Sequence, residues 1–396
     1  MVKKSCGLNK KRQTILNAGS NVVNVLMIVS WYSPHNVEKM SAGIFHYEQA
    51  IALKKYCDTA IYYPYDKDLD VDFLSCEENG MKTYRARLTK KNKIKKITQY
   101  ISDFKRIRQE FKPDIIHAHV AGEAGVVAII LGKLYSIPIV ITEHCPIELY
   151  GLERKKTRLK VGLVYHNSKR NVCVSRDFME RINKIYPKEN FEVIYNGIIN
   201  PSKIKLDEGN YRLINKENCC IVASFYSEKI KGYQYLLPAI RLLKKRGYEV
   251  ALHIVGGGIY MDKYKKMAMD MDLKDNCIFY GNCERQKVYS IIKQMDFSIS
   301  ASIFECSGVS VQEAMLLGKP LVVTKSGGAD SLVNEETAIV VERESVEALA
   351  NGIEKMLSQK SLYKPAKIRQ YALENFEIDE VSKRYMNLYK EVLEEK

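Results

Sequence analysis

Short apolar runs alternate with helix-forming segments along almost the whole chain, and this alternation constrains the fold more than any other feature. The runs are typical of buried strands, as at residues 25–29, 250–255 and 321–323. Segments with apolar residues at three- and four-residue steps follow them, which is the spacing of an amphipathic helix. Strands that alternate with helices pair in parallel, with helices on both faces of the sheet. The sequence therefore predicts an α/β fold built from doubly wound parallel sheets.

The chain is long enough for two such domains, and the strand–helix pattern starts again after a polar segment at residues 201–218. Its 396 residues and 46% apolar content are sufficient for two packed cores. Each half opens with a strand, a glycine-containing loop and a helix, so we expect two Rossmann-like domains that face each other across a cleft. We place a disordered basic leader at residues 1–24, the first domain at 25–200, the second at 201–379, and a helix that packs back on the first domain at 380–396.

Positive charge is concentrated in the first half of the chain. Residues 1–200 contain 33 Lys and Arg against 20 Asp and Glu, whereas residues 201–396 contain 29 against 27. A helix predicted at residues 91–112 has basic residues beside an apolar stripe, and a second basic run follows at residues 154–160. Two interpretations of the helix at residues 91–112 stay open. It is either a solvated helix packed on the sheet or a helix that contacts an anionic membrane surface. We exclude nucleic acid as a partner, because the chain contains no recognised nucleic-acid-binding module.

Several absences favour a cytoplasmic protein. No apolar segment is long enough to span a bilayer, and residues 1–24 lack the apolar core of a signal peptide. The ten cysteines include no C-x-x-C pair, so neither a disulfide framework nor a structural zinc site is expected. We therefore predict a cytoplasmic location, with peripheral attachment to the inner face of a membrane as a further option that the basic half suggests.

The segment at residues 300–331 carries the strongest functional signal. It contains two carboxylates, Glu305 and Glu313, on either side of a Ser-Gly turn and a helix start. The sequence Ser310-Val-Gln-Glu313 has the capping-box pattern, which predicts a hydrogen bond from the Ser310 amide to the Glu313 side chain. A glycine stop, a buried strand and a Gly-Gly loop follow. A helix start of this kind, facing a cleft beside strand ends, is suited to a phosphate group.

No metal site is predicted. The chain has no D-x-D motif at the end of a strand, and the acidic residues at 66–70 are expected to be solvated in a polar loop. His117 and His119 share one face of a predicted strand, which suggests a metal site, but no third ligand is evident in the sequence. We therefore expect these histidines to be packed or hydrogen-bonded, and we predict neither a metal nor a cofactor.

These motifs, in this order, resemble the retaining GT-B glycosyltransferases of glycosyltransferase family 4, the group 1 glycosyltransferases. The segment at 300–331 is similar to the family signature E-x-x-G-x-x-x-x-E-A-M-A-x-G-x-P-V-V…G-G. Its counterparts here are Glu305, Gly308, Glu313, Ala314, Met315, Gly318, Pro320, Gly327 and Gly328. Weaker matches in the same order occur at residues 117–119, 142–144, 174–175, 196–197, 231–232, 255–257 and 279–281. The resemblance covers roughly residues 25–395.

The resemblance implies a retaining hexosyltransferase with the GT-B fold. Such an enzyme moves a sugar from a nucleotide-sugar donor, by resemblance a UDP-sugar, to a hydroxyl of an acceptor. The acceptor would be a glycan or a lipid-linked glycan under assembly, as in polysaccharide biosynthesis. The donor is a substrate, so neither a cofactor nor a metal is implied.

The resemblance also implies roles for individual residues. Glu305 would bind hydroxyls of the donor sugar, Lys231 would neutralise the diphosphate, and His144 would lie beside the donor sugar and the acceptor. Glu313 would accept hydrogen bonds from the ribose hydroxyls. The other expected donor-binding residues surround the sugar, the phosphates and the base: Gly43, Ser224, Lys229, Gly281, Asn282, Ser307, Gly308 and Val309.

The chain departs from the family pattern beside the expected phosphate site. Ser224 stands where the family often carries an arginine, so one cationic phosphate contact is missing, and Lys229 is the candidate replacement. This departure supports an alternative function, a non-catalytic GT-B-like subunit that binds a nucleotide or a partner. A glycosidase is a further alternative for two carboxylates, but neither acid is expected to flank the scissile bond in this fold.

Overall fold

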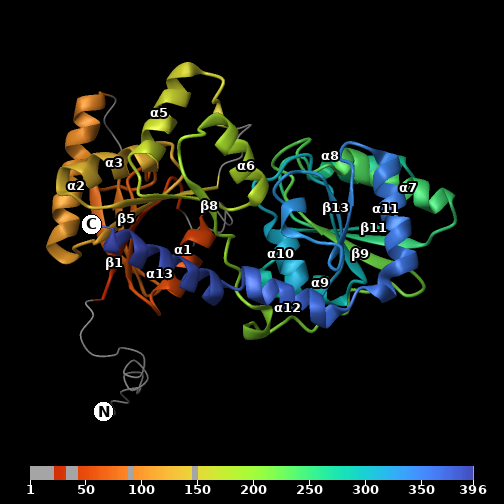
Figure 1. Ribbon diagram of the computed structural model, residues 1–396. Coiled ribbons are helices and arrows are strands. Elements are labelled where there is room, and N and C mark those ends of the chain that lie inside the picture. Colours follow the sequence, from red (N-terminus) through yellow and green to blue (C-terminus); the bar gives the residue numbers. More distant parts are fainter. Residues whose placement is uncertain (1–21, 33–42, 88–91, 145–149, 396) are drawn as a thin grey trace, which may run out of the picture.

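The computed structural model describes residues 22–32, 43–87, 92–144 and 150–395, which form two α/β domains (Figure 1). The first domain contains an eight-stranded sheet and the second a six-stranded sheet. Helices pack on both sheets, in the alternating order that the sequence predicts. The prediction of two doubly wound domains is therefore confirmed, whereas the leader predicted at residues 1–24 lies almost entirely outside the described residues.

The first sheet has the strand order β3-β4-β2-β1-β5-β6-β7-β8. Its strands are β1 Asn24–Ile28, β2 Asp58–Tyr63, β3 Phe73–Glu78, β4 Met81–Ala86, β5 Ile115–His119, β6 Ile139–Glu143, β7 Arg170–Cys173 and β8 Phe191–Val193. The helices of this domain are α1 Ile44–Leu53, α2 Lys93–Glu110, α3 Glu123–Tyr135, α5 Lys155–His166 and α6 Arg176–Ile185. Neighbouring strands are parallel except β3 and β4, which form an antiparallel hairpin at the sheet edge.

The β3–β4 hairpin departs from the predicted all-parallel sheet, although the sequence contains its signal. Asn79 and Gly80 form the two-residue loop, and their φ angles are both positive, 49° and 83°. A hairpin loop of this length needs left-handed backbone, which Asn and Gly tolerate best. The expectation that the acidic residues at 66–70 are solvated is wrong for Asp66 and agrees with the exposed Asp68 and Asp70. Asp66 is not solvated but 7% exposed, because its carboxylate accepts a hydrogen bond from Arg85 at 2.6 Å.

The second sheet has the order β11-β10-β9-β12-β13-β14, and all its neighbouring strands are parallel. Its strands are β9 Glu217–Val222, β10 Val250–Val255, β11 Cys277–Gly281, β12 Phe297–Ser300, β13 Leu321–Thr324 and β14 Ala338–Val341. The helices that follow are α7 Tyr233–Lys245, α8 Met261–Asp270, α9 Arg285–Gln294, α10 Val309–Leu316, α11 Val346–Gln359, α12 Pro365–Phe376 and α13 Ile378–Glu394. Short 3-10 helices occur at η1 Pro201–Lys203, η2 Asp330–Leu332 and η3 Lys360–Leu362. The winding direction reverses between β9 and β12, which is where open α/β sheets bind ligands.

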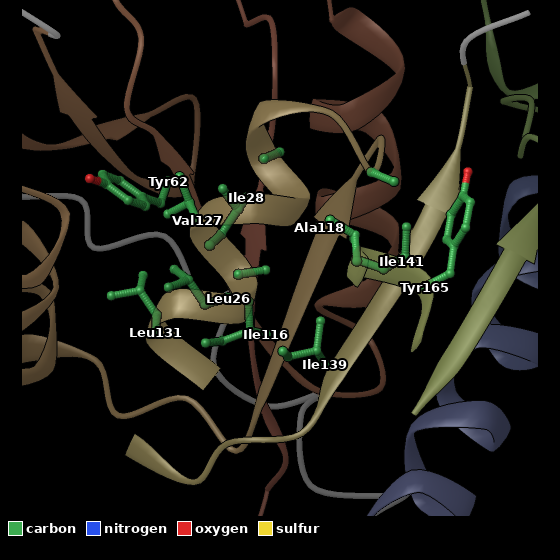
Figure 2. Close-up of a cluster of buried hydrophobic side chains, with 14 of the residues drawn as sticks. Leu26, Ile28, Tyr62, Ile116, Ala118, Val127, Leu131, Ile139, Ile141 and Tyr165 are labelled. Carbon is green, nitrogen blue, oxygen red and sulfur yellow. The ribbon is translucent and has the colours of Figure 1, made fainter. Parts of the chain in front are cut away.

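Residues of the central strand β1 alternate between two buried clusters. Leu26 and Ile28 pack with Val127 of α3 in the cluster that Figure 2 shows. Val25 and Met27 belong to a second cluster, which includes residues of α1 and α13. Successive side chains of a strand point to opposite faces of its sheet, so both faces of this sheet are buried. This burial explains why the strands are continuous apolar runs in the sequence.

The last helix, α13, leaves the second domain and packs on the first domain beside α1 (Figure 1). The hydroxyl of Tyr389 lies 2.7 Å from Nδ1 of His117, and Nε2 of that histidine lies 2.7 Å from Oγ1 of Thr142. The hydroxyl of Tyr385 lies 3.1 Å from the same Oγ1 atom. His117 is therefore hydrogen-bonded in the core, as predicted, and it ties the end of the chain to β5 and β6.

Gly232 sets the spacing between the loop after β9 and the end of β12. It precedes α7 with a φ of +72°, and a Cβ atom added to it would lie 1.8 Å from the carbonyl oxygen of Ala301. Gly247 offers a matched comparison, because its φ is +87° and an added Cβ would meet no atom within 4 Å. The two glycines thus share a left-handed backbone but differ in their surroundings.

We expect Gly232→Ala to destabilise the protein more than Gly247→Ala. Both variants carry the cost of an alanine in left-handed backbone, about 1–2 kcal/mol. Only Gly232→Ala must also displace the backbone at the end of β12. This displacement should lower the free energy of unfolding further, by about 1–3 kcal/mol. Urea unfolding followed by circular dichroism measures the difference. Equal unfolding midpoints for the two variants would contradict this account of the close approach.

Candidate active site

Loops from the carboxyl ends of both sheets meet between the two domains. Gly327, which follows β13, approaches Asp177 of α6 so closely that an added Cβ would lie 2.5 Å from its Oδ2 atom. Cys306, which follows β12, belongs to the buried cluster of the first domain. These loops therefore form one region shared by both domains, at the strand ends where this kind of sheet binds ligands.

Lys231 and Glu305 form an ion pair where the second sheet reverses its winding. Lys231 follows β9 and Glu305 follows β12, and Nζ of the lysine lies 2.5 Å from Oε1 of the glutamate. Oγ of Ser302 donates a second hydrogen bond to the same oxygen at 2.8 Å. The two charged side chains are 24% and 19% exposed, so both can still contact a ligand. A cation and a carboxylate held in this way can bind a phosphate and a sugar hydroxyl, respectively.

Helix α10 begins four residues after Glu305, and no side chain caps it. Gly308 is its N-cap residue, so the amides expected to face the donor, those of Ser307, Gly308 and Val309, lie at the helix start. The unpaired amides of a first helical turn attract anions. Gly308 leaves little room for a side chain, because an added Cβ would lie 3.0 Å from Cβ of Ala329.

Glu313 is buried, and its environment shows that the predicted capping box is wrong. The N-cap is Gly308 and not Ser310, and Glu313 accepts its hydrogen bond from the Tyr289 hydroxyl at 3.2 Å. Burial raises the pKa of Glu313 to about 7, while the charge of Arg285 and the Tyr289 hydrogen bond oppose that rise. The carboxyl group therefore changes its charge near neutral pH, and its ionised form can accept hydrogen bonds from hydroxyl groups.

A second ion pair joins the two domains near Glu313. Arg285, in the first turn of α9, donates from both terminal nitrogens to Glu48 of α1, and its Nη2 atom lies 3.3 Å from Oε2. Glu48 is only 11% exposed. No local sequence pattern signals this pair, because 237 positions separate its members along the chain.

Three histidines gather at the carboxyl ends of β5 and β6. Nδ1 of His119 lies 2.9 Å from Nε2 of His144, with the two rings stacked. His46 of α1 packs edge-on against both rings. Burial lowers the pKa of His144 to about 3, so its ring is neutral at pH 7 and can accept one hydrogen bond. The sequence predicts the position of His144, but it does not predict His46 as its neighbour.

The same three histidines are the one group in the described ranges that could hold a metal ion. One ligand atom from each lies within 4.8 Å of the others, and neutral imidazoles bind transition metals such as zinc. The sequence shows no third ligand beside His117 and His119. The fold brings His46 and His144 to His119, and His117 is not part of this group. The His119–His144 hydrogen bond satisfies one nitrogen of each ring without a metal.

Three of the remaining predicted donor-binding residues lie near the carboxyl ends of β9, β10 and β11. The carbonyl of Gly281, at the end of β11, accepts a hydrogen bond from the Gly256 amide at 2.9 Å. Asn282 covers Gly257, where an added Cβ would lie 2.7 Å from Cγ of the asparagine. Ser224 is half-buried in the loop after β9. The fold thus brings these three residues to neighbouring strand ends.

Gly43 and Lys229 complete the predicted set. Gly43 precedes α1 with a φ of +81°, and an added Cβ would lie 2.6 Å from the carbonyl oxygen of Trp31, so the backbone packing requires glycine there. The Lys229 side chain is exposed and makes no hydrogen bond or ion pair with another described residue. It is therefore not part of the ion pair between Lys231 and Glu305.

Two family models match the chain, one in each domain. Residues 59–199 match the model "Glycosyltransferase Family 4", and residues 208–375 match the model "Glycosyl transferases group 1". Together the two matches cover most of both domains, in the order that the sequence motifs indicate.

Individual relatives agree with these matches. The uncharacterized glycosyltransferase MJ1607 of Methanocaldococcus jannaschii is 25% identical over 62% of this chain and 66% of its own length. The alpha-monoglucosyldiacylglycerol synthase of Streptococcus pneumoniae is 24% identical over 58% of this chain and 56% of its own length. The chain thus spans less than two thirds of the length of these two curated relatives.

The solved structure of Anabaena Alr3699/HepE in complex with UDP matches 93% of this chain and 100% of its own, with a TM-score of 0.73 and 17% identity. Because family models match both domains, the protein belongs to the group 1 glycosyltransferases of family 4, and the likeness to the HepE structure shows that it has the GT-B fold.

Proposed function

We propose that this protein is a retaining glycosyltransferase that moves a hexose from a UDP-sugar to a hydroxyl of a glycan acceptor, without a metal ion. The observation that carries the proposal is the Lys231–Glu305 ion pair close to the uncapped start of α10. This arrangement combines a cation and amide donors for a diphosphate with a carboxylate for sugar hydroxyls. The HepE structure supports UDP as the nucleotide, because that protein was solved in complex with UDP.

Breaking the bond between the sugar and the diphosphate builds negative charge on the departing group. In our proposal, Lys231 and the amides of Ser307, Gly308 and Val309 donate hydrogen bonds to that charge, so its departure does not require a metal. Glu305 accepts hydrogen bonds from hydroxyls of the donor sugar and thereby orients the anomeric carbon.

The sugar keeps its anomeric configuration when the acceptor hydroxyl attacks the anomeric carbon from the same face that the diphosphate leaves. The acceptor oxygen bonds to the anomeric carbon, the bond from that carbon to the diphosphate oxygen breaks, and the acceptor proton passes to a phosphate oxygen. No protein nucleophile takes part, which separates this scheme from a retaining glycosidase. The neutral ring of His144 accepts a hydrogen bond from a hydroxyl of the donor sugar or the acceptor.

The nucleotide is proposed to lie on the second domain. Glu313 accepts hydrogen bonds from the ribose hydroxyls, and the loop at Gly281 and Asn282 surrounds the base. Gly43 lets the first domain approach the phosphates. Lys231 is the proposed cation of this site, because it is the lysine that pairs with Glu305.

A non-catalytic nucleotide-binding subunit is the second candidate. The observation that favours it is Ser224, which stands where the family often carries a phosphate-binding arginine. Both candidates bind a nucleotide at the same residues, but only the first releases a nucleoside diphosphate from a sugar donor.

We expect the protein to release UDP from a UDP-sugar in the presence of EDTA and an acceptor glycan. Glu305→Gln and Lys231→Met should each lower kcat/KM by about 10²–10³, the usual effect of removing one group that stabilises charge in a transition state. Glu342→Gln is the control, because Glu342 forms an exposed ion pair with Lys325 in the same domain. A coupled assay of nucleoside diphosphate release across a donor panel measures these rates. Binding of UDP without release from any donor would favour the non-catalytic candidate.

Exposed apolar side chains accompany basic residues on two helices of the first domain. On α5, Leu159 and Leu163 are 69% and 60% exposed, one helical turn apart. On α2, Ile94 is 71% exposed, whereas Phe104 and Ile107 are buried. The second half of α2 therefore packs on the domain, and its first turn stays accessible. Within the described part of the chain, no helix is long and apolar enough to cross a bilayer.

We propose that these helices bring a cytoplasmic enzyme to the anionic inner face of a membrane. Apolar side chains enter the headgroup region while lysine and arginine pair with anionic lipids. The basic residues around the two leucines of α5 are exposed: Lys155, Lys156, Arg158 and Lys160. The name of the Streptococcus relative, a glucosyldiacylglycerol synthase, supports a lipid-linked acceptor at such a surface.

The protein should sediment with liposomes that contain anionic lipid at low salt, and it should be released at high salt because salt screens the attraction. The double variant Leu159→Asp/Leu163→Asp should reduce the bound fraction several-fold. Leu362→Asp is the control, because Leu362 is equally exposed, at 69%, but lies in the second domain. Sedimentation of the unaltered protein at background level in low salt would refute membrane attachment.

A further inference from the structure

The ion pair between Glu48 and Arg285 joins the two domains directly. Glu48 lies on α1 of the first domain, and Arg285 lies at the start of α9 of the second. Both terminal nitrogens of the guanidinium donate to the two carboxylate oxygens, and the side chains are 32% exposed for the arginine and 11% for the glutamate. A forked pair of this kind is more directional than a lysine contact, so it holds the two helices in one relative position.

The face of α9 that carries Arg285 also faces Glu313. Tyr289 lies one helical turn after Arg285, and its hydroxyl donates to Oε1 of Glu313. The charge of Arg285 lowers the pKa of Glu313, and the charge of Glu48 raises it. Glu313 is therefore influenced by Arg285 and Tyr289 from α9 and by Glu48 from α1. A change in the contact between the domains alters the electrostatic environment of this carboxyl group.

Helix α1 also carries other groups of the candidate site. Gly43 precedes it, and His46 packs on His144 in the histidine group. Glu48 follows His46 by two positions, so the ion pair with Arg285 fixes α1 relative to the second domain. The two halves of the site are held together where each contributes a predicted ligand-binding residue.

We propose that Glu48 and Arg285 form an interdomain latch, and that Arg285 is a positioning residue that couples closure of the two domains to nucleotide binding at Glu313. This inference rests on the proposed function, in which Glu313 binds the ribose. Arg285 acts in two ways: it holds α1 against α9 through Glu48, and its positive charge favours the ionised form of Glu313. Exchanging the two charged residues separates these two effects, because the ion pair is kept while the charge beside Glu313 is reversed.

The test uses the full-length protein and four variants: Arg285→Glu, Glu48→Arg, the double exchange Glu48→Arg/Arg285→Glu, and Arg285→Gln. Small-angle X-ray scattering without ligand reports the contact between the domains. Each single charge reversal should increase the radius of gyration, because it places like charges opposite each other, and the double exchange should restore it. Arg246→Glu is the matched control, since Arg246 is 34% exposed and pairs with Glu354 inside the second domain.

Titration calorimetry with UDP reports the effect on Glu313. The dissociation constant should rise roughly tenfold in Arg285→Glu, within the usual range of coupling between two sites. The double exchange should leave UDP binding weak at pH 7, because it places a carboxylate where Arg285 stands. In Arg285→Gln, the pH at which UDP binding reaches half its maximum should move upward, since the positive charge no longer favours ionised Glu313.

The two measurements distinguish failure of this inference from failure of the proposed function. An unaltered protein that binds no UDP would contradict the proposed nucleotide site, and the scattering of the charge-reversal variants would still decide whether the latch exists. Unchanged scattering in all variants would overturn the latch. An unchanged UDP dissociation constant and pH profile in Arg285→Gln, in a protein that binds UDP, would overturn the coupling to Glu313.

Discussion

The close approach of the loop after β9 to the end of β12 is the constraint on which the candidate site depends. These strands are neighbours at the point where the second sheet reverses its winding, so their loops leave in opposite directions. Gly232 lets the first loop touch the backbone of Ala301, and this contact places Lys231 beside Glu305. A side chain at position 232 would meet the backbone of Ala301 and so push the loops that carry Lys231 and Glu305 apart.

The two domains are joined by more than the chain connections between them. Helix α13 contributes Tyr385 and Tyr389 to a buried cluster of the first domain, where their hydroxyls contact a buried histidine and threonine. On the other side of the site, Glu48 and Arg285 form a charged contact that is only partly buried. The first connection is buried among apolar side chains, whereas water can compete for the second. The contact beside the candidate site is thus the one that, in our proposal, opens and closes.

Buried titratable groups in the candidate site are neutral or close to it. His144 is neutral because burial lowers its pKa to about 3, and burial raises the pKa of Glu313 to about 7. Lys231 and Glu305 are partly exposed and neutralise each other. Among these four described side chains little charge is therefore left uncompensated, and in our proposal an anionic donor displaces the glutamate from Lys231.

The sequence by itself determined the strand and helix pattern, the order of the motifs, and the glycines that tight loops require. These features follow from contacts between near neighbours, so apolar spacing and backbone preferences reveal them. It also contained the Asn79-Gly80 hairpin signal. Only the tertiary structure decided which distant side chains meet, such as Glu48 with Arg285 or His46 with His144. The tertiary structure also differs from one local preference. Glu313 does not cap its own helix, because it is buried against α9 and accepts a hydrogen bond from Tyr289 there. Local rules act within a few residues, whereas these contacts exist only once the sheets have formed and the two domains have met.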